Sequence, residues 1–167
     1  MNNDHSIGSE MYRWSREIFP INRSITGPGV RKTLKYFQNI IPDLKIKSIP
    51  SGTKVFDWTV PNEWKLKEAY IEDENESRII DFKNNNLHVV GYSHSINKWL
   101  NIEDLDSHLF SLPDRPDAIP YVTSYYEKNW GFCLTHNQRK KLKKGKYHVV
   151  INSELNPGVL NYGELII

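Results

Sequence analysis

The sequence has little of what covalent cross-linking or membrane insertion requires. A single cysteine, Cys133, stands among 167 residues, so an internal disulfide cannot form and a disulfide-rich secreted scaffold is excluded. No apolar run approaches the roughly 18 residues of a membrane span. The N-terminal MNNDHSIGSE has neither the basic flank nor the apolar run of an export signal. We therefore expect a cytoplasmic protein without a membrane span.

A large excess of one charge is also absent. The formal net charge is +2, but the segment 139–146, RKKLKKGK, carries six of the 22 basic residues, which leaves the rest mildly acidic. The cations of this segment are not interleaved with aromatic side chains. The pattern therefore favours a solvated helix face over nucleic-acid binding.

Aromatic residues, by contrast, are abundant. They make up 12% of the chain and include five Trp and nine Tyr, which is far more than a disordered chain carries. The length suits one domain, or two small modules that share a core. The chain is expected to fold.

Two amphipathic helices are predicted at the N-terminal end. Ile7, Met11, Trp14 and Ile18 recur at helical spacing and predict a helix that ends near Phe19, before a proline. For a second helix, Thr26 is the expected N-cap and Pro28 lies in the first turn. Its apolar stripe consists of Val30, Leu34, Phe37 and Ile41.

From Leu44 the hydrophobic period changes to two, which predicts a β-rich middle. The expected strands are LKIKSI, TKVFDWTVP, KLKEAYI, SRIIDF and NLHVVGYS, with EDENE as a solvated hairpin tip.

Mixed elements are predicted after this stretch. A short helix follows Asn101, and YVTSYY and WGFCLT form an aromatic hairpin around EKN. Thr135 to Gln138 match a capping box that opens a basic helix ending at Gly145, and two last strands are joined by N-P-G.

No residue pattern defines an active site. His88 and His94 lack a third ligand at a fixed offset, so structural or solvent-facing roles are favoured for them. Cys133 with His136 makes only half of a zinc site, and a partly buried thiol is favoured for Cys133. The acids show no spacing suited to acid and base roles, SITGPG lacks the Lys-Ser/Thr of a phosphate loop, and no G-x-S-x-G is present.

Longer blocks of the sequence resemble the N-terminal part of a bacterial family of aminopeptidase-like proteins related to the co-catalytic zinc exopeptidases. The blocks are MYRWSREIFPINRSITGPGVRKTL, VFDWTVPNEWKLKEAYI, NNLHVVGYSHS, LPDRPDAIPYVTSYYEKNWGFCLTHNQ and GVLNYGELII, and together they extend from about Glu10 to Ile167. Members of this family are often associated with polysaccharide biosynthesis.

The resemblance implies an α/β (α+β) fold in three parts. Residues 1–61 would form the N-terminal helices and first strands of a peptidase-like core. Residues 62–148 would form an inserted β-rich module, and residues 149–167 the strand pair that returns to the core.

The resemblance also implies what this chain does not contain. In the family the metal ligands follow the returning strands, in a His-x-Cys-His-Pro block, an Asp-Asn pair and later acids and a histidine. No position of this sequence matches them, so no catalytic, cofactor-binding or metal-binding residue is assigned, and zinc is expected only in complete relatives. We expect the chain to be inactive as a hydrolase by itself.

The inserted module would overhang the cleft of a complete relative and select peptide-like or glycan-linked substrates. Its candidate substrate-facing residues are Tyr125, Tyr126, Trp130 and His136. The alternative is a non-catalytic interaction module that binds a peptide or a carbohydrate. Because the helix stripes and the terminal ELII would expose apolar edges, a partner chain or a second copy is expected to cover them.

Overall fold

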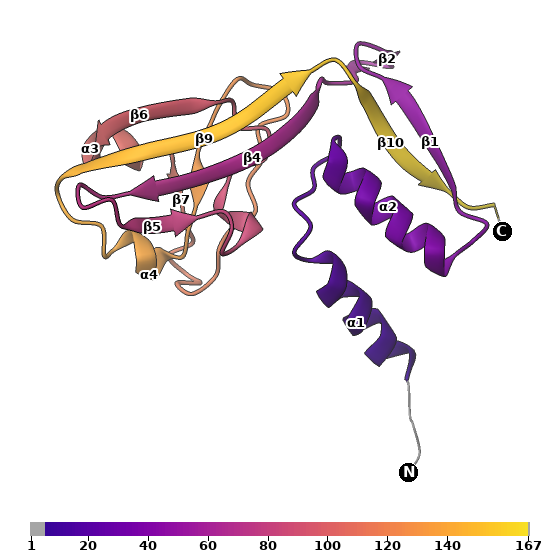
Figure 1. The fold of residues 1–167 in the computed structure, drawn as a ribbon, viewed down its shortest axis with the longest axis horizontal. Helices are drawn as coiled ribbons and strands as arrows, with labels where there is room; N and C mark the ends of the chain where they lie inside the picture. Colours follow the sequence, from indigo (N-terminus) through magenta and orange to yellow (C-terminus); the bar gives the residue numbers. More distant parts are fainter. Residues whose placement is uncertain (1–5, 167) are drawn as a thin grey trace.

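A computed structural model describes residues 6–166 and shows a β-rich module beside a smaller unit of two helices and a β-ribbon (Figure 1). The mixed α/β class expected from the sequence is confirmed. The first helix, α1 (Ile7–Ile18), begins at Ser6, whose hydroxyl accepts a hydrogen bond from the Ser9 N–H. None of its residues is fully buried: Ile7 and Met11 of the apolar stripe are exposed, whereas Trp14 and Ile18 are half-buried.

The second helix, α2 (Pro28–Ile40), starts at Pro28 as predicted, but the predicted cap is wrong. Gly27 occupies the N-cap position with φ +96°, and no side chain caps the helix. Thr26 points into the protein instead, where its hydroxyl bonds to Tyr92. A buried partner far along the chain has displaced the local capping bond.

A two-stranded antiparallel ribbon joins two segments that are far apart in the sequence. It pairs β1 (Lys45–Pro50) with β10 (Val159–Glu164), and α2 packs against β10. The segment TKVFDWTVP folds into a small hairpin of β2 (Lys54–Val55) and β3 (Trp58–Thr59) rather than one strand.

The module is built on a four-stranded antiparallel sheet in the order β5-β4-β9-β6. Its strands are β4 (Glu63–Glu72), β5 (Arg78–Asp81), β6 (Ile96–Asn101) and β9 (Lys146–Asn156). The EDENE segment forms the turn between β4 and β5, as predicted. The sheet continues to Asn156, whereas the sequence analysis placed the end of the module at residue 148. From there the chain turns through N-P-G into β10 (Figure 1).

The inner face of this sheet is covered by short elements and loops. These are η1 (Asn86–His88), α3 (Ile102–Asp106), β7 (Leu109–Phe110), β8 (Phe132–Cys133) and α4 (His136–Arg139). Ile71, Val149 and Ile151 of the sheet meet Phe132 and Leu134 in a core where all five are 0% exposed.

Three local predictions in this region are wrong. The aromatic hairpin does not form, because β8 pairs in parallel with β7 and the residues 121–126 contribute a single bridge at Thr123. NLHVVGYS is η1 followed by a loop, not a strand. The basic helix ends at Arg139, well before Gly145, although its Thr135–Gln138 capping box is confirmed.

Candidate functional site

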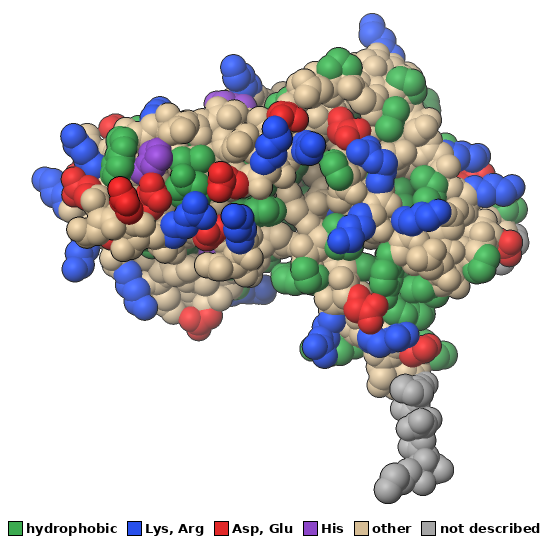
Figure 2. All heavy atoms as spheres, viewed as in Figure 1, with side chains coloured by type: hydrophobic (Ala, Val, Ile, Leu, Met, Phe, Trp, Pro, Cys, Tyr) green, Lys and Arg blue, Asp and Glu red, His purple; other side chains and the backbone are tan. Residues whose placement is uncertain are grey.

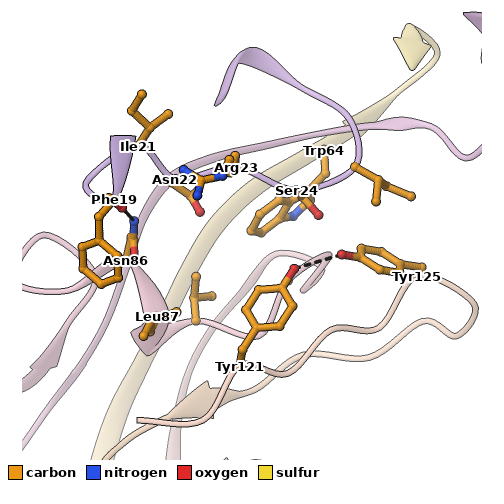
Figure 3. Close-up of a pocket in the computed structure, with 13 residues that line it drawn as sticks. Phe19, Ile21, Asn22, Arg23, Ser24, Trp64, Asn86, Leu87, Tyr121 and Tyr125 are labelled. Carbon is orange, nitrogen blue, oxygen red and sulfur yellow. Dashed lines mark hydrogen bonds between the residues drawn. The ribbon is translucent and has the colours of Figure 1, made fainter. Parts of the chain in front are cut away.

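A hollow of about 480 Å³ lies where the linker between α1 and α2 meets the module (Figure 3). Residues 21–25 of the linker and Phe19 form one wall. The module contributes Trp64, the loop with Asn86 and Leu87, and the loop with Tyr121 and Tyr125. Its volume falls in the range of about 300–1,000 Å³ that ligand pockets occupy.

The linker wall is held by hydrogen bonds to both sides. Asn86 Nδ2 donates to the Phe19 carbonyl oxygen at 2.5 Å, and Arg23 Nη1 donates to the Ile18 carbonyl oxygen at 2.7 Å. Gly29 packs so closely that a Cβ atom there would lie 1.8 Å from the Asn22 carbonyl oxygen. The linker is therefore a fixed wall.

Trp64 anchors the floor of the hollow. Its indole Nε1 donates to the Ser93 carbonyl oxygen at 2.9 Å, and its backbone N–H donates to the Thr26 hydroxyl. The Tyr92 ring stacks on Trp64 with the centroids 5.8 Å apart, and Tyr125 meets Tyr92 edge to face at 5.0 Å. These contacts fix the Tyr125 ring from behind.

The polar groups of the hollow are able to hydrogen-bond a ligand. The hydroxyl oxygens of Tyr121 and Tyr125 are 3.0 Å apart and share a hydrogen bond (Figure 3). The Ser24 hydroxyl is buried without a hydrogen-bond partner. Arg23 brings the single charged side chain to the lining, which includes no acid, histidine or cysteine.

Two of the four residues predicted to face a substrate lie here. Tyr125 lines the hollow, and Tyr126 is 81% exposed beside it, where both border a smaller hollow of about 250 Å³. Trp130 is 5% exposed and stacks on His108 with the centroids 3.7 Å apart. His136 lies at the start of α4, where Nδ1 shares a hydrogen bond with the Ser111 hydroxyl.

Sequence reasoning did not find Tyr121, Trp64 or the linker as parts of one site. The linker sequence INRSITGPG could have indicated such a site, because its polar residues and glycines are typical of an ordered turn that makes specific contacts, rather than of a flexible tether. Its partners lie about 40 to 100 residues further along the chain, beyond the reach of periodicity.

The described residues do not fit a zinc ion. Within residues 6–166 no three His, Cys, Asp or Glu side chains are grouped to hold a metal. Cys133 is fully buried, and that burial raises its pKa to about 12, whereas a zinc ligand must be a thiolate. His88 and His94 each place Nδ1 at 2.8 Å from a backbone carbonyl oxygen.

The basic segment 139–146 is partly committed to the fold. Arg139 forms an ion pair with Asp106 at 2.7 Å and donates to the Leu109 carbonyl oxygen.

Among residues 6–166, no helix combines the length and the apolar character needed to cross a bilayer.

Comparison with known proteins gives a consistent set of relatives. Residues 63–154 match the model of a family described as a domain of unknown function, DUF2172. The chain is 49% identical, over 165 residues, to a Clostridium acetobutylicum protein that is provisionally named a polysaccharide biosynthesis protein with an aminopeptidase-like domain. The match covers 99% of this chain and 38% of that relative.

A solved structure agrees with this result. The crystal structure of a protein from Clostridium acetobutylicum, provisionally described as a peptidase, superposes with a TM-score of 0.89 at 50% identity. The superposition covers 93% of this chain and 37% of that one. The resemblance to aminopeptidase-like proteins is thus confirmed, and the chain spans less than two fifths of the length of the relatives it matches.

Proposed function

Because the chain belongs to the DUF2172 family of domains of unknown function, matched over more than half of its length, we propose that it is the substrate-facing portion of an aminopeptidase-like protein. In this proposal it corresponds to the N-terminal portion of a longer zinc-dependent hydrolase. The module guides substrates, and zinc and the catalytic groups belong to the remainder of that longer protein, in the cytoplasm.

The hollow beside Tyr121 and Tyr125 carries this proposal. It offers aromatic rings, phenol hydroxyls and one guanidinium group, which bind and orient a ligand. Its lining has no nucleophile paired with a base, and none of the His, Cys, Asp or Glu side chains that hold a catalytic metal for amide hydrolysis. The site is therefore suited to recognition, with chemistry performed elsewhere.

The two walls of the hollow suggest how it would hold a ligand. One wall belongs to the helical unit and the other to the module, so a ligand held there would be fixed relative to both. An amphipathic end of a peptide-like or glycan-linked substrate fits the mixture of apolar residues with Arg23. Fixing that end would position the scissile bond in the cleft of a complete relative.

A second candidate is an interaction module, favoured by the open apolar stripe of α1. Ile7 is 77% exposed and Met11 is 56% exposed, so half of the four apolar residues of this stripe remain open to a partner. A partner chain or a second copy that covers this stripe would account for it. The two candidates are compatible, since the stripe and the hollow use different surfaces.

Amide hydrolysis tests the proposal directly. The purified chain, supplied with Zn²⁺ or Co²⁺, is expected to give no turnover of aminoacyl amides. A chimera in which it replaces the matching portion of the Clostridium acetobutylicum relative is expected to be active.

In the chimera, Tyr121→Ala should raise KM several-fold, because aromatic contacts contribute about 0.5–1.5 kcal/mol. Phe56→Ala is the matched control, because Phe56 is fully exposed and belongs neither to the hollow nor to the α1 stripe. Turnover by the chain alone that is lost on chelation would overturn the proposal.

A further inference from the structure

A second feature of the module lies away from the hollow, on the outer face of its four-stranded sheet. Four side chains, one from each strand, contact one another in a row across the sheet. This row, which we call the ring row, consists of Arg78 of β5, Tyr70 of β4, His148 of β9 and Trp99 of β6. The Arg78 guanidinium carbon lies 3.9 Å from the Tyr70 centroid, and Tyr70 meets His148 edge to face at 6.1 Å. His148 then stacks on Trp99 at 5.1 Å with 16° between the planes.

The strand register explains why these four side chains share the outer face. His148 is opposite Glu72 on one side and Trp99 on the other. Its neighbour Val149 points into the core and is 0% exposed. Because side chains alternate between the two faces, the partners of His148 face outward with it. Figure 2 shows hydrophobic, acidic, basic and histidine side chains together over this end of the module.

The ring row is held in place by charged and polar neighbours. His148 Nδ1 lies 2.6 Å from Glu72 Oε1, and its Nε2 lies 2.8 Å from Asn97 Oδ1. Arg78 Nη1 donates to Asp81 Oδ2 at 2.8 Å. A ligand would thus find these side chains already oriented, which lowers the entropy cost of binding.

Trp99 is the exposed end of the ring row. It is 48% exposed on β6, an edge strand of the sheet. Stacking on His148 covers part of the indole and stabilises the strand pair, while nearly half of the Trp99 side chain stays exposed. The wide indole surface left open to solvent is therefore available to a ligand.

The charges around the ring row select the class of ligand. Glu68 and Asp81 pair with Arg78, and Glu72 pairs with His148, so the ring row has no unpaired cation with which to hold a nucleic-acid backbone or an anionic membrane surface. A neutral sugar chain needs no such cation. The C–H face of a pyranose ring packs on an aromatic ring, while its hydroxyls bond to carboxylate, amide and guanidinium groups.

We propose that the ring row is a binding site for a neutral glycan, with one pyranose ring stacked on Trp99 and its hydroxyls directed to Asn97 and Glu72. None of these residues lines the hollow between the linker and the module. The site is therefore independent of the proposed function, and either can fail without the other.

Affinity electrophoresis of the purified chain in gels that contain a neutral polysaccharide tests this site, with dextran, cellulose ether, xylan and mannan as probes. At least one is expected to retard the chain. Titration with the matching hexasaccharide is expected to show about tenfold weaker binding for Trp99→Ala, as loss of one aromatic stack implies. Phe56→Ala is the matched control, because Phe56 is a fully exposed aromatic residue outside the module and its removal should leave binding unchanged.

The outcomes separate the alternatives. Retention of binding in Trp99→Ala, or retardation by none of the four probes, overturns the proposal. Binding to single-stranded DNA that falls steeply with salt, without glycan binding, also overturns it in favour of nucleic acid. If Trp99→Ala loses its cooperative melt, Trp99→Leu takes its place, because leucine keeps apolar contact with the sheet but lacks the flat ring.

Discussion

Thr26 connects the linker to the module through one buried hydroxyl group. The residue is 2% exposed, and its Oγ1 lies 2.5 Å from the Tyr92 hydroxyl and accepts the Trp64 N–H at 3.2 Å. Tyr92 in turn donates to the Asn62 carbonyl oxygen. The Thr26 hydroxyl therefore satisfies the buried Trp64 N–H and gives the Tyr92 hydroxyl a second partner beside the Asn62 carbonyl oxygen.

Thr26→Val tests this connection at the scale of the residue. Valine has nearly the same shape but cannot accept the Trp64 N–H, so we expect the free energy of unfolding to fall by about 1–3 kcal/mol. Urea denaturation followed by tryptophan fluorescence measures the change. Thr26→Ser, which keeps the hydroxyl and loses a methyl group, should cost less. Equal stability of the valine variant and the wild type would show that the hydroxyl contributes nothing.

Helix α2 and strand β4 are joined by an ion pair between the helical unit and the module. Arg31 Nη1 and Nη2 donate to the two carboxylate oxygens of Glu63 at 2.8 and 2.7 Å. The hydrogen bonds from Arg31 hold the pKa of Glu63 below its ordinary value, against the opposing effect of burial. Because the folded state then binds fewer protons than the unfolded state, the pair stabilises the fold most above the ordinary carboxyl pKa.

Glu63→Gln is expected to reduce the free energy of unfolding at pH 7 by about 0.5–1 kcal/mol, a modest value because Arg31 is partly exposed. The difference from wild type should shrink as the pH falls from the unfolded carboxyl pKa, about 4.3, through the lower folded one. Urea denaturation at pH 7 and pH 3 measures it. Glu154→Gln, which breaks a more exposed pair with Lys67, should have a smaller effect at pH 7. A difference that stays constant with pH would contradict the assignment.

At the scale of the whole molecule, the hydrophobic core belongs to the module. The buried residues of the core cluster lie between Trp64 and Ile151, and among the described residues before Trp64 only the partly buried Ile25 packs against them. In α1 and α2 together, Thr33 is the single buried residue among those described. The module therefore holds most of the apolar burial that stabilises a fold.

A fragment of residues 62–156 is accordingly expected to fold alone. It keeps all four strands of the central sheet and the core cluster, and it loses the contacts of Thr26 and Ile25. We expect a cooperative thermal transition by circular dichroism and dispersed amide signals by NMR, with a lower melting temperature than the whole chain. A fragment of residues 6–61 is the matched comparison and should show no cooperative transition. The opposite pattern would place the folding unit elsewhere.

Several elements were predictable because neighbouring residues decide them. The apolar spacing of α1, the Thr135–Gln138 capping box and the N-P-G turn between β9 and β10 all depend on contacts within a few residues. The wrong prediction of an aromatic hairpin has the opposite cause. β8 pairs with β7 rather than with residues 121–126, since partners distant in sequence compete for the same backbone groups.

The candidate sites divide in the same way. Tyr125 and Tyr126 could be suggested from their aromatic segment, whereas Trp130 from the same segment stacks on His108 inside the module. Tyr121, Trp64 and Arg23 meet at the hollow only because the linker folds back onto the module. The ring row forms only when four strands have this order and register, and no local sequence pattern predicts either of them.

The sequence by itself determined the helices, the β-rich module, the lone thiol and the resemblance to aminopeptidase-like proteins, because local periodicity and long matching blocks are properties of the chain. The tertiary structure alone decided that Thr26 faces inward, that the linker closes a hollow and that Trp99 ends an open row of rings. These features join residues far apart in the chain, and their contacts exist only after the sheet has set its strand order and register.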